Sequence, residues 1–201
     1  MAAPVYAGNQ EHYFPILGLL ALATTLSVYI GLRGGVLQPS ALVAGALLTG
    51  GGVIQLMTGI RSHQQGSHFA AATLFPLGIF WLSLISYDIF PALGIGRHPN
   101  SLTMFCYLSL WGFFMAVLFL GSFRQVLIIQ ILYGSMMFSF MALAIDHLRS
   151  DQVFLFLGCL TGIFASFAAV IMAWAVYRFR ISGQRGLLLA SVFPEQEPER
   201  E

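Results

Sequence analysis

Two glutamines stand out in this chain because apolar residues surround them. Gln55 lies within GGGVIQLMTGI (50–60) and Gln130 within LIIQILYG (127–134). Burying an unpaired side-chain amide in an apolar medium costs roughly 2–7 kcal/mol. Each amide therefore either hydrogen-bonds to a neighbouring helix or faces a wet pathway, where it replaces part of the hydration of a small polar solute. The spacing of the residues leaves both interpretations open.

The ionisable residues predict neither a catalytic centre nor a metal site. Asp88 and Asp146 lie near the ends of apolar segments, where we expect solvated charges, and we assign His147 to a surface cluster. The spacing of His63 and His68 suits a metal, but no third ligand is nearby in the sequence. The sequence also lacks the short motifs of nucleotide-binding loops, hydrolases and metalloproteases, so we expect no enzyme activity and no cofactor.

The composition predicts an integral membrane protein. Of the 201 residues, 58% are hydrophobic and only 8% are charged, whereas soluble domains are about 25% charged. The net charge is +1, with no basic block suited to nucleic acid. Both cysteines, Cys106 and Cys159, fall inside apolar stretches, which excludes a disulfide framework.

The apolar stretches are long and do not alternate with polar residues, so they predict helices rather than a membrane barrel. A transmembrane helix needs about 20 apolar residues. We predict an all-α protein with six transmembrane helices, at residues 14–32, 41–60, 69–90, 102–122, 125–147 and 153–177. Residues 14–177 then form the membrane domain, flanked by a short segment at 1–13 and an acidic, disordered tail at 178–201.

The arginines predict the orientation of these spans. More arginines fall on the side that carries both ends of the chain, which places both termini in the cytoplasm by the positive-inside rule. On that side lie Arg61, Arg124, Arg178, Arg180, Arg185 and Arg200, and on the other lie Arg33, Arg97 and Arg149. The very short connection at 123–125 predicts that the fourth and fifth helices are antiparallel neighbours.

Small residues and tryptophans predict contacts between the helices. Gly158, Gly162 and Ser166 are spaced by four, so they share one face of the sixth helix and allow a neighbour to approach closely. Trp81 and Trp111 lie well inside their spans, and their indole N–H groups need partners there. Both are therefore candidates for helix contacts or for the lining of a pathway.

Motifs along most of the membrane region carry a family resemblance. The matches around the second and third helices are Gly51, Gly52, Gln55, Gly59, Gly66, Phe69, Phe80, Trp81 and Leu82. Further matches are Pro99, Asn100, YLSLWG (107–112), Gly121, Gln130, Ser135 and ALAI (142–145). In these residues the chain resembles the acetate uptake transporters, the group that contains the bacterial succinate–acetate permease and its fungal acetate and ammonia-export relatives.

The chain also departs from that family's pattern. The first-helix signature Asn-Pro-Ala-Pro-Leu-Gly-Leu survives only partly in HYFPILGL (12–19). The family's narrow girdle of a phenylalanine, a tyrosine and a leucine becomes Ala21 or Leu22, Leu77 and Met136. Losing the tyrosine hydroxyl removes a polar contact, and methionine adds a flexible, polarizable wall. We therefore identify the chain as a divergent member.

The resemblance implies a hexameric ring with a pore in each protomer, in a plasma or bacterial inner membrane. It implies passage of acetate or a similar small monocarboxylate, with or without protons. In that hypothesis the girdle constricts the pathway, Ala168 sets the width of the pocket, and polar residues flank it: Gln55, Trp81, Asn100 and Gln130. The alternatives are ammonia or another small neutral solute, and a scaffold of the same fold that transports nothing.

Overall fold

The computed structural model of the chain describes residues 15–182. In that part the chain forms six long helices and no strand. The helices are α1 (Ile16–Arg33), α2 (Ala41–Gln64), α3 (His68–Ala92), α4 (Ser101–Gly121), α5 (Leu127–Arg149) and α6 (Gln152–Ser182), and the 3₁₀ helix η2 (Ser122–Arg124) links α4 to α5. Each long helix is long and apolar enough to cross a membrane. The prediction of an all-α membrane protein with six spans is confirmed.

The observed helix ends differ from the predicted ones by a few residues. The α2 helix continues to Gln64 and α6 to Ser182, past the predicted ends at 60 and 177. A helix satisfies its backbone hydrogen bonds internally whether or not its side chains are apolar, so it can outlast its apolar run. Most of the predicted tail, from residue 183 on, and the predicted N-terminal segment lie outside the described residues.

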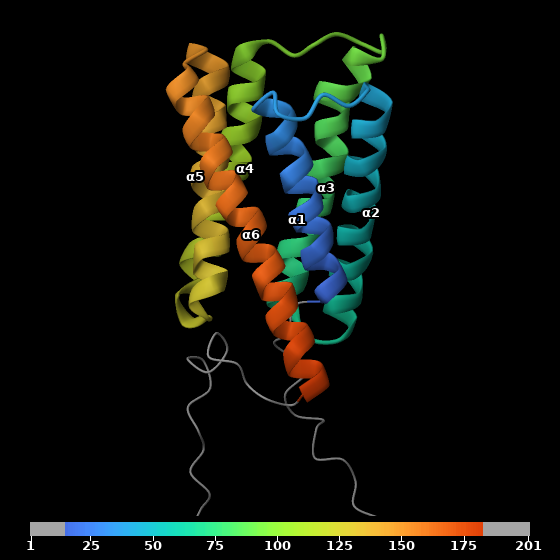
Figure 1. The fold of residues 1–201 in the computed structure, drawn as a ribbon, viewed down its shortest axis with the longest axis vertical. Coiled ribbons are helices and arrows are strands. Elements are labelled where there is room, and N and C mark those ends of the chain that lie inside the picture. The colour runs from blue at the N-terminus through green and yellow to red at the C-terminus, as the bar shows by residue number, and fades with distance from the viewer. Residues whose placement is uncertain (1–14, 183–201) are drawn as a thin grey trace, which may run out of the picture.

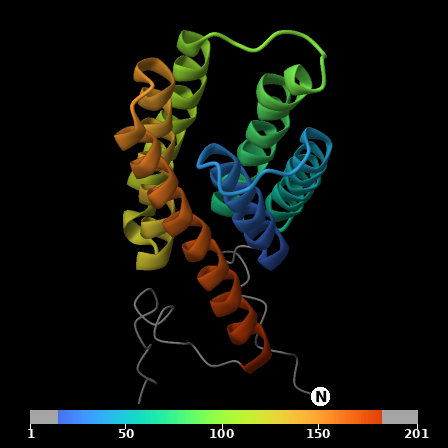
Figure 2. The ribbon, with the colours of Figure 1, turned by 45° about the horizontal axis from the view of Figure 1, so that its top comes forward.

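The helices stand side by side and alternate in direction (Figure 1). The α1 helix packs on α2 and α6, α2 packs on α3, and α5 packs between α4 and α6. The antiparallel pairing of α4 with α5 confirms what the short connection predicts. The α6 helix slants across the bundle (Figure 2) and contacts both α1 and α5, so it joins the α1–α3 group to the α4–α5 pair. The α1–α2, α3–α4 and α5–α6 connections all lie at one end, called the Arg33 end below.

The odd-numbered helices are the inner ones. In the apolar windows of α1, α3 and α5, 56% of the residues are buried, against 33%, 28% and 33% in α2, α4 and α6. Residues such as Met57, Leu110 and Phe167 expose most of their surface. The even-numbered helices thus carry the large apolar outer surface expected in lipid or against other subunits.

Glycines bring α2 close to its neighbours. A Cβ placed on Gly51 would lie 2.1 Å from Thr25 Cγ2 of α1, and one on Gly52 would lie 3.2 Å from Trp81 Cβ of α3. A Cβ on Gly59 would lie only 2.6 Å from the backbone nitrogen of Phe75. A side chain at Gly59 would strike the backbone of α3, and one at Gly51 would displace Thr25, so the glycine-rich stretch around Gln55 allows α1 and α3 to approach α2 closely.

Candidate functional site

Gln55 is a residue of α2 whose side chain lies in the packed interior against α1. Its side chain is fully buried, and Nε2 donates a hydrogen bond to Thr25 Oγ1 at 3.1 Å. The Thr25 hydroxyl in turn donates to the backbone oxygen of Ala21 at 2.9 Å or of Leu22 at 3.1 Å. The other end of the amide, Oε1, is buried and has no partner in the described part of the chain. Gln55 is therefore a link between helices that still has a free acceptor.

Trp81 presents a buried donor of the same kind. The residue is fully buried on α3, and its Nε1 has no hydrogen-bond partner among residues 15–182. Its ring meets Tyr29 edge-on, with the ring centroids 5.9 Å apart, and its Cβ packs against Gly52, one helical turn before Gln55. The bundle interior thus contains an unpaired acceptor and an unpaired donor.

The residues predicted to form the constriction are all interior. Leu22, Leu77 and Met136 are completely buried, and Ala21 is 7% exposed. Leu22, Leu77 and Met136 belong to one continuous apolar core, supplied by the inner helices α1, α3 and α5. Ala168 is buried on α6, in the same core. These positions suit an apolar barrier, and their role as a constriction stays a prediction.

The other two polar candidates bond to nearby backbone. Gln130 is half-buried near the start of α5, and its Nε2 donates to the backbone oxygen of Gln125 at 3.0 Å. Asn100 is exposed and caps α4, since its Oδ1 accepts from the backbone nitrogen of Thr103 at 2.8 Å. Their roles in a pathway remain predictions as well.

The Arg33 end corrects two expectations from the sequence. Asp146 is not a solvated helix-end charge: it is buried on α5, and its Oδ2 accepts a hydrogen bond from Arg33 Nη2 at 2.8 Å. His147 is half-buried rather than part of a surface cluster. The ion pair joins residues far apart in the sequence, so the local pattern around Asp146 gives no sign of it.

Sequence reasoning also missed two polar residues of α1, Thr25 and Tyr29. With Arg33 they are spaced by four along a mostly apolar helix, which places them on one face. That spacing is the signal by which they could have been found. Thr25 is fully buried and Tyr29 is 1% exposed, so this polar face of α1 looks into the bundle.

His63 and His68 meet at the opposite end of the molecule. Their rings lie edge-to-face with centroids 5.4 Å apart, across the turn between α2 and α3. In the described part of the chain no group of three or more potential metal ligands comes together. The pair is an aromatic contact in this turn.

The sequence of the chain matches a family of membrane proteins. Residues 4–180 match the profile of the GPR1/FUN34/yaaH family. The succinate-acetate/proton symporter SatP of Escherichia coli (strain K12) is 27% identical over 123 residues, which cover 61% of this chain and 65% of that protein. The chain thus matches slightly less than two thirds of this relative's length. Accumulation of dyads protein 2 of Saccharomyces cerevisiae is 26% identical over 192 residues, covering 92% of this chain and 66% of that protein.

The fold is also that of a solved structure. The structure of the bacterial acetate channel SatP superimposes on the chain with a TM-score of 0.80 at 23% sequence identity. The superposition covers 87% of this chain and 96% of that one. The arrangement of six helices in Figure 1 is therefore a known membrane fold.

Proposed function

Since the chain belongs to the GPR1/FUN34/yaaH family, we propose that it passes acetate or a similar small monocarboxylate across a membrane, through a pathway inside each six-helix bundle. The choice of solute is supported by the names of two similar proteins, a succinate-acetate/proton symporter and an acetate channel. All six helices are long and apolar enough to cross a membrane, and α1, α3 and α5 are more buried than the others. The pathway therefore runs along these three inner helices.

The observation that carries the proposal is the pair of unpartnered polar atoms in the interior, Gln55 Oε1 and Trp81 Nε1. A protonated carboxylic acid has one O–H donor and one C=O acceptor, which are the complements of that acceptor and that donor. An ionised acid would leave the acceptor unpaired and add the large cost of burying a charge. The interior therefore favours passage of the neutral acid, which amounts to moving a proton together with the carboxylate.

The barrier in this pathway is apolar. Leu77 and Met136, with Leu22 or Ala21, form the constriction, and Ala168 on α6 sets the width of the pocket behind it. These side chains are buried and carry no charge, so they reject ions and admit small neutral molecules. Gln130 and Asn100 flank the pathway with less weight, because each already bonds to backbone.

The functional unit is a homo-hexamer in a plasma or bacterial inner membrane, with one pathway in each protomer. The outward faces of α2, α4 and α6 support this assembly, since they expose many large apolar side chains. Cross-linking of the purified protein in lipid nanodiscs tests the subunit number, and a ladder that ends at six bands is the expected result.

Uptake by proteoliposomes tests the function. Labelled acetate should enter proteoliposomes faster than it enters protein-free liposomes. The protein-free liposomes set the baseline, because neutral acids cross lipid unaided. At constant total acetate, protein-dependent flux should fall about tenfold per pH unit above the pKa of the acid, which is roughly 4–5. Methylammonium uptake in the same vesicles tests the neutral-solute alternative. Acetate flux equal to the baseline at every pH from 5 to 8 would rule out the proposal.

A further inference from the structure

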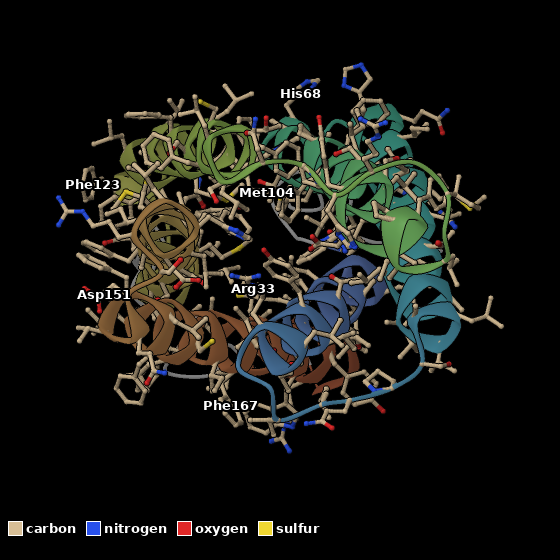
Figure 3. All side chains as sticks on the ribbon, turned by 90° about the horizontal axis from the view of Figure 1, so that it is seen from above. Arg33, His68, Met104, Phe123, Asp151 and Phe167 are labelled. Atoms are coloured by element: carbon tan, nitrogen blue, oxygen red, sulfur yellow. The ribbon has the colours of Figure 1, made fainter. Side chains whose placement is uncertain are left out.

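A cavity of about 410 Å³ opens at the Arg33 end of the bundle. It lies outside the proposed constriction, and side chains of all three inner helices reach it. Figure 3, which looks onto this end, shows Arg33 and Met104 pointing toward the centre of the bundle. The polar lining consists of Tyr29, Arg33, Asp88, His98, Ser101 and His147. The cavity is large enough for a small organic acid with its water.

Three of these lining residues contain buried polar atoms without a partner in the described part of the chain. The atoms are the Tyr29 hydroxyl oxygen, Arg33 Nε and His147 Nε2. Arg33 Nε is always a donor, a tyrosine hydroxyl can donate, and an imidazole nitrogen donates when protonated. Asp146 accepts from Nη2 of the same guanidinium at 2.8 Å and so holds the side chain in place. Each of the three atoms can donate a hydrogen bond to an acceptor, and all three belong to residues that line the same cavity.

The positions of these residues tie the cavity to the proposed pathway. Arg33, Asp88 and His147 follow Leu22, Leu77 and Met136 by eleven residues each, on the same three helices. Eleven residues make about three helical turns, or about 16 Å. The charged level therefore lies on the same helix faces as the constriction, about 16 Å further toward the Arg33 end.

We infer that this cavity is a binding site for a carboxylate anion, anchored by the Arg33 guanidinium with Tyr29 and His147 beside it. An arginine fork matches the geometry of a carboxylate. The choice of acetate as the ligand rests on the proposed function, whereas the anion site rests on the cavity and its unpaired donors. The acid is held here in its charged form before it meets the apolar constriction.

Ionisable groups of both signs surround the cavity. Asp146 pairs with Arg33 at 2.8 Å, and Asp88 lies in the cavity wall with His98 and His147.

Acetate binding to the purified full chain in detergent tests the site. We expect saturable binding in a saturation-transfer NMR titration at pH 6, and no saturable signal from acetamide, which has the same shape without the charge. Arg33→Gln should weaken acetate binding at least tenfold, and Tyr29→Phe several-fold. Arg149→Gln is the matched control, because it removes an exposed arginine at the same end of the bundle and should leave the titration unchanged.

The double variant Arg33→Gln/Asp146→Asn guards against a folding defect. It removes the ion pair without leaving a buried carboxylate unpaired, so it should fold and still lose acetate binding. Binding equal to that of the wild type in both Arg33 variants, or acetamide binding as tight as acetate binding, would overturn the site. Acetate binding without acetate flux would instead leave the site standing and refute the proposed function.

Discussion

Variants at the Gln55–Thr25 contact can distinguish a role of Gln55 in helix packing from a role in solute binding, because the two polar atoms of the Gln55 amide differ in their contacts. Nε2 is bonded to Thr25 and Oε1 is free. Thr25→Val removes the bond between the helices but keeps the amide and the shape of the side chain that packs on Gly51. Gln55→Leu removes the amide as a whole. Thr25→Val therefore removes only the bond between the helices, whereas Gln55→Leu removes both that bond and the free acceptor.

The expected magnitudes differ between the two variants. A hydrogen bond between membrane helices contributes about 0.6 kcal/mol on average and at most about 1.7 kcal/mol. Thr25→Val also leaves Nε2 unpaired in the interior, so we expect the free energy of unfolding to fall by about 1–2 kcal/mol. Gln55→Leu loses the same bond but also removes the unpaired Oε1, so its stability should change by less than about 1 kcal/mol.

Acetate flux should respond in the opposite order. If Oε1 accepts a hydrogen bond from the passing acid, losing a bond of about 1.4 kcal/mol lowers the flux about tenfold in Gln55→Leu. Thr25→Val keeps that acceptor, so its flux should fall less than threefold. Unfolding in mixed micelles gives the stabilities, and uptake by proteoliposomes with equal amounts of protein gives the fluxes. Gln55→Leu with wild-type flux and reduced stability would show that Gln55 only joins helices.

Three further changes follow from the same contacts. Leu77→Ala should raise the butyrate-to-acetate flux ratio at least threefold in proteoliposomes, since it removes a fully buried side chain from the proposed constriction; an unchanged ratio would exclude Leu77 from that constriction. Gly78→Ala places a Cβ 2.7 Å from a backbone oxygen of α2 and should lower unfolding stability in micelles by about 2 kcal/mol or more, whereas Gly50→Ala, with open space around it, should cost nothing. Tyr133→Phe breaks the 2.6 Å bond to Thr73 and should cost about 0.6–1.7 kcal/mol in the same unfolding assay; a loss above about 3 kcal/mol would contradict this simple deletion.

The six helices could be predicted because the signal for each is local. An apolar run of about 20 residues has to be a helix in lipid, whatever it packs against. The stretch around Gln55 also carries a local signal, since its glycines at positions 51, 52 and 59 predict that neighbouring helices approach α2 closely there. The spacing of the glycines does not identify the residues that they contact. In the structure these residues are Thr25, Trp81 and Phe75.

The charged end could not be predicted, because its signal is not local. Asp146 next to His147 at a helix end is typical of a solvated pair, and nothing near it in the sequence points to Arg33. The ion pair between them spans 113 residues. Thr25 and Tyr29 were open to prediction from their spacing on α1, but polar residues at i and i+4 also occur in helices that merely pack.

The offset between the charged residues and the proposed constriction matches half the thickness of a bilayer's hydrocarbon core. The hydrocarbon core is about 30 Å thick, so its edge lies about 15 Å from its middle. Arg33, Asp88 and His147 lie about 16 Å beyond the residues of the proposed constriction, since each is eleven residues further along its helix. A constriction at the middle of the bilayer therefore puts all three ionisable residues at its edge, where a charged side chain costs far less than at the centre. The inner helices α1, α3 and α5 run in the same direction, so the same offset on each helix would place the proposed apolar barrier in the core and the proposed anion site at the water.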